Sequence, residues 1–395
     1  MKIVINGAGI AGPTLAYWLQ QSGHDVLLVE EYPRFRGSGY VIDFWGLGYD
    51  IAERMSVIPR VRDLGYQVRE VRFMDRQGDK AAGFSTDVFE RMTDGRFTSL
   101  QRSDLAATIF NTVQDKVETI FGDSVAQIDE RADGVRVGFD HAAPRDVDLV
   151  IGADGLHSRV RGLVFGSEDE FAFNLGYHVA AFAIKGYRPR DDLVYVSHAQ
   201  PGRQISRFSM RGDATLFLFV FRDEYMSGED PADELQHKSL LRRAFAGVGW
   251  ECPRILDLMS GAGEVYFDRV SQIRMDRWSK GRTALVGDAA ACVSLLAGEG
   301  CGLAMAEAYV LAGELNRAGG DHHRAFARYE ERLTPFLKRK QESAARFATS
   351  FVPRTAIGIA FRRIATRLLR FPAVADYFIG RDLRDDVELP DYAAM

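Results

Sequence analysis

The chain has 395 residues, 46% of them hydrophobic and 27% charged, as in an ordinary globular protein of one large or two smaller domains. Its formal net charge of −5 argues against a nucleic-acid-binding surface. Cys252, Cys292 and Cys301 form no CxxC pair, and no run of about 18 apolar residues predicts a membrane span. With no secretory leader before a first strand at Lys2, we expect a cytoplasmic protein.

The first thirty residues have the pattern of a dinucleotide-binding βαβ unit. An apolar run at 3–5 leads into Gly7-Ala8-Gly9-Ile10-Ala11-Gly12, then a helical stretch and a second apolar run at 26–29. Gly7 allows a tight turn, Gly9 lets the backbone approach a pyrophosphate, and Gly12 lets the helix pack on the strand. Glu30, followed by Glu31, lies where an acid that binds a ribose is expected. The glycines alone do not separate NAD from FAD.

A second glycine turn follows a helix and three short strands. Residues 103–112 predict a helix with Ser103 as its N-cap. Short strands are expected at 117–120, 124–128 and 135–139. The apolar run 149–151 then leads to Asp154-Gly155, with Ser158 and Arg161 just beyond.

The segment from about 165 to 275 reads as a separate, largely antiparallel sheet. Its β-rich runs at 177–184, 193–197, 204–210 and 214–221 are broken by Gly, Pro and Asp. Phe208 and Met210 share one strand face, as do Phe217, Phe219 and Phe221. These side chains either cover an apolar ligand or pack on helices, and both alternatives stay open. No side chain stands out as a substrate base among His178, His198, Arg207 and Arg211, so we assign no catalytic residue.

A third glycine turn begins the last part of the chain. Val286-Gly287-Asp288 is followed by Gly298-Glu299-Gly300-Cys301-Gly302 and by a helix expected at 304–315, whose start should face a cofactor. A long helix is expected at 326–351. The basic, amphipathic segment 357–371 has a composition that can bind a membrane surface, but we expect it to pack across the domains. The acidic tail 382–391 should loop over the surface.

The three turns together resemble those of the single-component FAD-dependent aromatic hydroxylases, which include p-hydroxybenzoate hydroxylase and the tetracycline-inactivating monooxygenases. The resemblance implies that Glu30 binds the adenosine ribose, Asp288 the ribityl chain, and Asp154 the region where flavin and NADPH meet. Arg102 matches the family's flavin-contacting arginine, although a solvated helix-start residue is the alternative. Cys301 either approaches the flavin or is a small buried residue. The candidate cofactor-binding residues are Gly7, Gly9, Ile10, Ala11, Gly12, Glu30, Glu31, Arg102, Asp154, Asp288, Gly298, Gly300, Cys301 and Gly302.

The third turn departs from the family pattern. Ala291 stands where the family usually has His, Ser294 and Leu295 where it has a Pro-Pro pair, and Gly302 where it has Asn. Cofactor binding stays the expectation, while the polarity of the active site and the movement of the flavin become open questions.

We therefore predict an α/β fold with a Rossmann-type FAD-binding domain, an inserted and mainly antiparallel substrate domain, and C-terminal helices. The FAD-binding domain is expected at 1–65, 96–164 and 276–325, the substrate domain at 66–95 and 165–275, and the helical segment at 326–395. A monomer or homodimer is expected, with no metal.

The expected function is hydroxylation of an aromatic or polyketide-like polycyclic molecule. FAD is held non-covalently, NADPH or NADH binds transiently, and O2 reacts through a flavin C4a-hydroperoxide, as the resemblance implies. The alternatives are a reductase or dehydrogenase on the same fold, and a flavin-binding protein without turnover.

Overall fold

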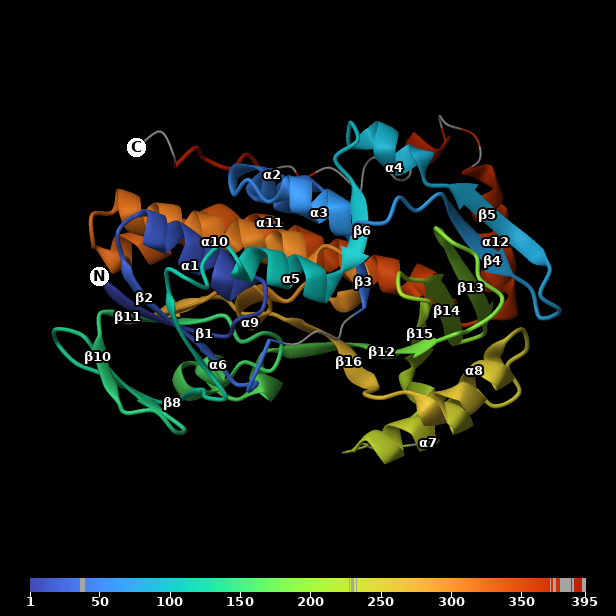
Figure 1. The fold of residues 1–395 in the computed structure, drawn as a ribbon, viewed down its shortest axis with the longest axis horizontal. Helices are drawn as coiled ribbons and strands as arrows, with labels where there is room; N and C mark the ends of the chain where they lie inside the picture. Colours follow the sequence, from blue (N-terminus) through green and yellow to red (C-terminus); the bar gives the residue numbers. More distant parts are fainter. Residues whose placement is uncertain are drawn as a thin grey trace.

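The computed structural model describes residues 1–35, 40–226, 228, 231, 233–369, 371, 374–376, 385 and 387–392. These residues form an α/β fold in which a six-stranded and a seven-stranded sheet lie toward opposite ends of the long axis (Figure 1). The fold class predicted from the sequence is therefore confirmed. The domain boundaries remain a prediction.

The six-stranded sheet brings the three glycine turns to one edge. Its order is β17-β18-β11-β1-β2-β7, and all neighbours pair in parallel except β17 and β18. Because β18, β11 and β1 lie side by side, the turns that follow their carboxyl ends meet, which is where ligands bind in open α/β sheets. The strands are β1 (Lys2–Asn6), β2 (Asp25–Glu30), β7 (Glu118–Phe121), β11 (Leu149–Gly152), β17 (Ser279–Lys280) and β18 (Thr283–Leu285).

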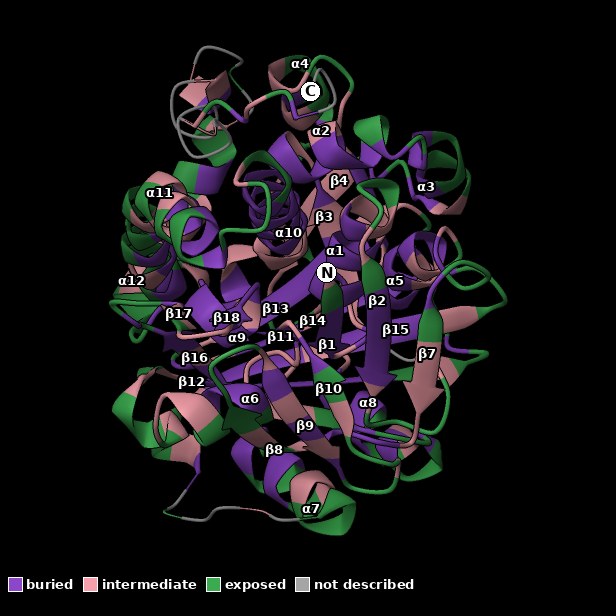
Figure 2. Cartoon of the chain, turned by 90° about the vertical axis from the view of Figure 1, so that its left-hand side faces the viewer, coloured by how far each residue is buried: buried purple, intermediate pink, exposed green. Residues whose placement is uncertain are grey.

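Helices pack on this sheet and on one another. Helix α1 (Ala11–Gln21) packs on α10 (Gly300–Arg317), which in turn contacts α2 (Gly46–Arg54) and α11 (His322–Phe351). Helix α10 is apolar on nearly all sides, and Figure 2 shows it in the buried centre of the molecule. Helix α5 (Arg102–Phe110) packs on α1 and on α3 (Ile58–Leu64).

Smaller elements complete the cofactor half. Strands β8 (Val125–Glu130), β9 (Val135–Phe139) and β10 (Arg145–Val147) form an antiparallel sheet, and α6 (Arg159–Val164) packs on β8. Strands β3 (Val41–Phe44) and β6 (Thr98–Gln101) pair just before α5. Ser103 is not the N-cap of α5, contrary to the prediction: the helix begins at Arg102, directly after the extended Gln101. The Arg102 N–H donates to the Tyr40 carbonyl at 3.0 Å, so a backbone contact takes the place of a side-chain cap.

The seven-stranded sheet is almost entirely antiparallel, in the order β16-β12-β15-β14-β13-β4-β5, with β13 and β4 as the parallel pair. Its outer face is covered by α7 (Glu234–Ala244) and α8 (Cys252–Leu258), and α4 (Asp87–Met92) follows β5. Phe217, Phe219 and Phe221 belong to the core beneath α7 and α8, so for these residues packing on helices is the correct alternative. The strands are β4 (Glu70–Met74), β5 (Lys80–Ser85), β12 (Ala172–Lys185), β13 (Val194–Gln200), β14 (Arg203–Ser209), β15 (Ala214–Arg222) and β16 (Tyr266–Ile273).

The C-terminal part differs from two expectations. Helix α12 (Ala356–Leu368) packs on β5 and β13 of one sheet rather than across both halves of the molecule. The described tail residues are docked instead of looping over the surface: Leu389 and Tyr392 are buried, and the Tyr392 hydroxyl donates to Glu314 at 2.6 Å. Leu389 and Tyr392 give the otherwise acidic tail apolar surface that it can bury against the rest of the molecule. Residues 382–384 and 386 lie outside the described residues.

Within the described part of the chain, no helix has an apolar stretch that is long enough to cross a lipid bilayer.

Candidate cofactor and substrate site

One cavity of about 930 Å³ joins the three glycine turns to the seven-stranded sheet. All candidate cofactor-binding residues line it except Gly12 and Gly302. The residues that do are Gly7, Gly9, Ile10, Ala11, Glu30, Glu31, Arg102, Asp154, Asp288, Gly298, Gly300 and Cys301. Segments far apart in the chain thus surround one volume, and the part each residue takes in binding remains a proposal.

The first turn requires Gly7 and Gly12 because a Cβ atom at either position would collide with neighbouring backbone atoms. Gly7 has φ +109°, and a Cβ there would lie 2.4 Å from the Ala153 carbonyl oxygen of the second turn. A Cβ on Gly12 would lie 1.9 Å from the Gly7 carbonyl oxygen, so Gly12 permits the close packing of α1 on the turn. Glu30 accepts hydrogen bonds from the Ala8 N–H at 2.7 Å and the Tyr32 N–H at 3.1 Å. Its carboxylate therefore orders the turn that it borders.

The second turn is fixed by its own aspartate. Asp154 accepts hydrogen bonds from the Asn6 amide at 3.0 Å and the Val160 N–H at 3.1 Å, and also from the Ser158 hydroxyl. Arg161 is fully buried and donates to the Ala289 carbonyl at 3.2 Å. Arg161 thereby links the second turn to the third.

The third turn is braced from behind by a buried acid that sequence reasoning missed. Gly287 has φ +64°, and its N–H donates to the Glu307 carboxylate of α10 at 2.8 Å. Tyr329 of α11 donates to the same carboxylate at 3.1 Å. Burial raises the pKa of Glu307 to about 8, although both hydrogen bonds act in the opposite direction. No cofactor motif signals Glu307, because its position on α10 follows from packing.

Asp288, the first residue of α9 (Asp288–Ala291), faces the cavity beside Arg102. Burial raises the pKa of Asp288, and the positive charge of Arg102 acts against that shift. Burial also raises the thiol pKa of Cys292 and of Cys301. Both thiols are therefore protonated at neutral pH, which argues against either as a nucleophile.

Helix α10 begins at Gly300 on the cavity wall, where a Cβ would lie 3.8 Å from the Asp288 carboxylate. Gly302 faces away from the main cavity: its neighbour is Gly48 of α2, and a Cβ on Gly48 would lie 2.3 Å from the Gly302 Cα. The glycine at the family's Asn position thus serves the close crossing of α2 and α10.

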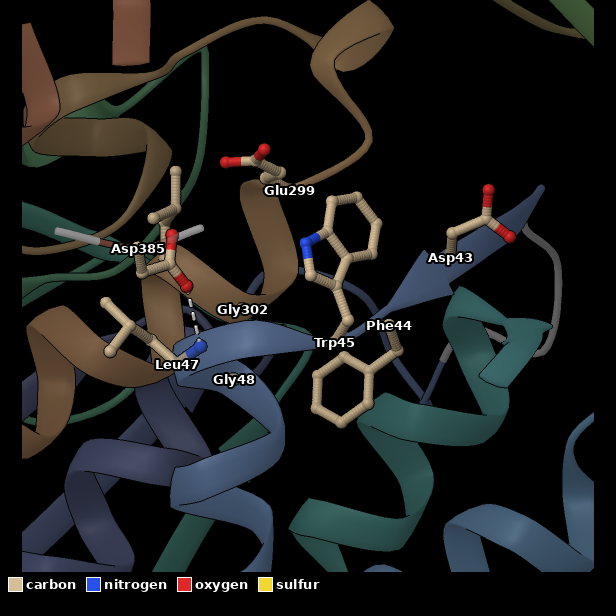
Figure 3. A pocket seen from close by; sticks show the side chains of 9 residues that line it. Asp43, Phe44, Trp45, Leu47, Gly48, Glu299, Gly302 and Asp385 are labelled. Atoms are coloured by element: carbon tan, nitrogen blue, oxygen red, sulfur yellow. Dashed lines mark hydrogen bonds between the residues drawn. The ribbon is translucent and has the colours of Figure 1, made fainter. Parts of the chain in front are cut away.

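The C-terminal tail supports the start of α10 from the other side (Figure 3). Asp385 accepts a hydrogen bond from the Leu47 N–H at 2.9 Å, at the start of α2. Lys340 of α11 bridges Asp385 at 2.8 Å and Glu299 at 2.7 Å. The loop before α10 is therefore tied to α2 and α11 through the tail.

The loop that lacks the family's proline pair has an unusual backbone conformation. Ser294 has φ +132° and lines the cavity with Leu295. Proline fixes φ near −65°, so the backbone found here excludes a proline at 294. The replacement of the family's proline pair thus goes together with a loop backbone that a proline at position 294 could not adopt.

The wall opposite the turns has an apolar part beside Asp268, Arg269 and Ser271 of β16, and it was not predicted residue by residue. It includes Ala181, Phe182 and Ala183 of β12, Leu216 of β15, and Met210 after β14. Phe208 and Met210 belong to one core cluster with Ala181 and Leu216, and of the two only Met210 lines the cavity. Leu216 and the buried Phe217 point to opposite faces of β15. The two-residue period of the strand was therefore the signal that could have placed Leu216 at the cavity.

Two tyrosines missed by sequence reasoning also line the cavity. The rings of Tyr40 and Tyr266 lie 5.9 Å apart, and the Tyr266 hydroxyl donates to Asp268 at 3.1 Å. Burial raises the pKa of both phenols, so both are neutral and can donate hydrogen bonds. No motif marks either position.

The four polar residues considered as substrate bases have structural partners away from the cavity. His178 lies 3.1 Å from Asp223, and His198 contacts the Met74 carbonyl. Arg207 pairs with Asp191 and Glu251, and Arg211 donates to the Gly65 carbonyl. None of the four lines the cavity.

Comparison with known proteins agrees with this geometry. Residues 110–341, more than half of the chain, match the model of the FAD binding domain family. The chain is 39% identical over 346 residues to an uncharacterised protein of Mycobacterium tuberculosis, covering 86% of this chain and 91% of the relative. It is 35% identical over 352 residues to a flavin-dependent monooxygenase of an unknown prokaryotic organism, covering 89% and 90%. The crystal structure of tetracycline destructase Tet(51) superposes with a TM-score of 0.83 at 32% identity, covering 99% of both chains.

Proposed function

Since the chain belongs to the family of FAD-dependent monooxygenases of the aromatic hydroxylase type, we propose that it uses NAD(P)H and O2 to hydroxylate an aromatic or polycyclic small molecule. The observation that carries this proposal is the single cavity between the glycine turns and an apolar wall. A cofactor at the turns and an apolar ligand at the wall share one volume there, as oxygen transfer between them requires.

The residues around the cavity suit FAD. Ligand sites commonly measure about 300–1,000 Å³, so this cavity has room for a large cofactor. The N-terminus of α1 receives the pyrophosphate, and Glu30 the adenosine ribose. Asp288 receives the ribityl chain, while Gly9 and Gly300 keep the walls free of Cβ atoms.

Bound and reduced FAD supplies the activation of O2 and the transfer of one oxygen atom. The protein contributes the electrostatic setting. The start of α10 at Gly300 directs backbone N–H groups and the positive end of the helix dipole toward the cavity. This field favours the negative charge of the reduced cofactor.

The apolar part of the wall is proposed to set the substrate class. Strands β12 and β15, both described in full, contribute only Ala181, Phe182, Ala183 and Leu216 to the cavity. An uncharged, flat and polycyclic substrate fits such a wall, and tetracycline destructase Tet(51) is similar to this chain in structure. Neutral Tyr40 can donate a hydrogen bond to a substrate oxygen, whereas the Tyr266 hydroxyl already donates to Asp268 and can accept one from the substrate.

A reductase or dehydrogenase on the same fold is the second candidate. The observation in its favour is the loop at Ser294 and Leu295, which replaces the family's proline pair beside the flavin. The two candidates differ in whether O2 is consumed in proportion to product.

Anaerobic stopped-flow reduction tests the proposal. Polycyclic phenols, with a tetracycline among them, are mixed with the FAD-loaded protein and NADPH, and O2 consumption is then measured in air. A substrate should accelerate FAD reduction and consume one O2 per product. Leu216→Asn should reduce the acceleration of FAD reduction by that ligand. Leu235→Asn, at an exposed position of α7, should leave the acceleration unchanged. Conversion of a ligand without O2 consumption would contradict hydroxylation.

A further inference from the structure

Helix α12 presents its apolar face to solvent. Ile357 is 81% exposed, Phe361 71%, Ile364 56% and Leu368 47%. Their spacing of i, i+4, i+7 and i+11 places them in one row along the helix. We call these four residues the α12 ridge. A stripe of this kind normally faces a core, so its exposure calls for a partner.

The opposite face of α12 anchors the helix through arginines. Arg362 is half-buried, donates to Gln204 at 2.7 Å and lies over the Phe73 ring at 4.7 Å. Arg367 donates twice to the Ala81 carbonyl, at 2.7 and 3.1 Å. Thr355 caps the helix by accepting from the Gly358 N–H at 3.1 Å. These contacts hold the ridge on the outward side of α12. The helix lies beside β4 and β5, at the end of the molecule away from the six-stranded sheet (Figure 1).

The segment that carries the ridge is positively charged, although the whole chain carries a net charge of −5. The segment 354–371 contains Arg354, Arg362, Arg363, Arg367 and Arg370 and has no Asp or Glu. In the β4–β5 hairpin, the Asp79 N–H and, to a smaller extent, the positive charge of Arg363 lower the pKa of Asp75. Arg354 and Arg367 are exposed, and the group that Arg367 contacts on β5 is an uncharged carbonyl.

We propose that the α12 ridge docks this protein on the surface of an anionic lipid bilayer. Large apolar side chains enter the boundary between headgroups and acyl chains, while flanking arginines meet the anionic headgroups. Because no described helix is suited to span a bilayer, the contact is peripheral.

A second copy of the chain fits the ridge less well. A two-fold pairing of α12 with itself brings Arg354 and Arg367 of both copies together, and like charges oppose such an interface. A stable interface also needs about 800 Å² from each partner, which is large for one face of a 13-residue helix.

Vesicle flotation tests this inference with the FAD-loaded protein. Vesicles of phosphatidylcholine, with or without phosphatidylglycerol, are compared at low and high salt. The wild type should float with the anionic vesicles only, and salt should weaken the binding. The double variant Phe361→Ser/Ile364→Ser should bind at least about tenfold more weakly. Arg354→Gln should reduce binding severalfold.

Leu235→Ser is the matched control, because Leu235 is 76% exposed on α7, which covers another part of the seven-stranded sheet. This variant should float like the wild type. Unchanged FAD content and unfolding temperature establish that each variant is folded. Failure of the wild type to float with anionic vesicles would overturn the proposal, as would flotation of the double variant at the wild-type level. Light scattering that shows a dimer lost in the double variant would assign the ridge to a second copy instead.

Discussion

The Glu307 carboxylate of α10 accepts a hydrogen bond from the Gly287 N–H at 2.8 Å, so the helix that follows the third glycine turn also holds that turn. Gly287 directly precedes Asp288, the acid proposed to bind the ribityl chain. The geometry of the cofactor site therefore depends on a buried acid outside the cavity lining.

Glu307 should make the folded protein less stable as the pH rises. Its pKa is raised by burial from 4.5 to about 8, so the folded state retains a proton that the unfolded state has released. The associated stability is present below about pH 4.5 and is lost as the pH rises through about 8. Glu307→Gln keeps an acceptor for Gly287 and should remove this pH-dependent loss, which is on the order of 5 kcal/mol for a pKa raised from 4.5 to about 8.

Urea unfolding between pH 5 and 9 measures this effect. Glu342→Gln, on the exposed face of α11, is the control and should retain the wild-type slope. Parallel curves for the wild type and Glu307→Gln would contradict a buried, titrating Glu307.

Asp288→Ala should weaken FAD binding by roughly tenfold to a hundredfold, because a hydrogen bond to a charged group in a buried site contributes about 1.5–3 kcal/mol. Asp288→Asn retains an acceptor oxygen and should lose less. Quenching of flavin fluorescence gives both dissociation constants. Equal affinity in the wild type and the Ala variant would place Asp288 outside the cofactor contacts.

Ser294→Gly should be more stable than Ser294→Ala by about 1 kcal/mol. Both variants lose the Ser294 hydroxyl, which accepts from the Leu296 N–H at 3.3 Å, but only glycine adopts φ +132° without strain. Ser294→Pro, which restores a family residue, should lower both stability and FAD retention. Thermal unfolding ranks the variants, and an Ala variant as stable as the Gly variant would show that no strain resides at this position.

Gly48→Ala should destabilise the protein by about 1–3 kcal/mol, because the new Cβ would lie 2.3 Å from the Gly302 Cα and must push α2 from α10. FAD affinity should fall as well, since the start of α10 borders the cavity. Gly162→Ala in α6 is the matched control: its Cβ would meet nothing within 4 Å, so no loss is expected. Equal stability of the two variants would mean that the close crossing of the helices is not required.

The sequence predicted the parts of the site that depend on backbone geometry. Gly7, Asp154 and Asp288 follow buried strands, and parallel pairing of those strands was sufficient to bring them together. The packing role of Gly12 was predicted, whereas that of Gly302, which faces Gly48 of α2 rather than the cavity, was not. A motif records the residue type required but not which neighbour requires it.

Tertiary packing determines what the sequence left open. Tyr40 and Tyr266 come from separate segments whose meeting depends on how the two sheets are placed. Tyr392 docks against Glu314 although the tail around it is acidic. The outward face of α12 was unexpected because amphipathicity shows that a helix has two faces, not which face is covered.

Labelled dioxygen distinguishes hydroxylation from a reductase or dehydrogenase reaction, because only hydroxylation transfers an oxygen atom from O2 to the product. The FAD-loaded protein is supplied with NADPH, 18O2 and a ligand that accelerates FAD reduction, and the product is analysed by mass spectrometry. Hydroxylation predicts a product that carries one 18O atom, with less peroxide released than in the absence of ligand. A rapidly formed product without label would contradict it and identify a reductase or dehydrogenase on the hydroxylase fold.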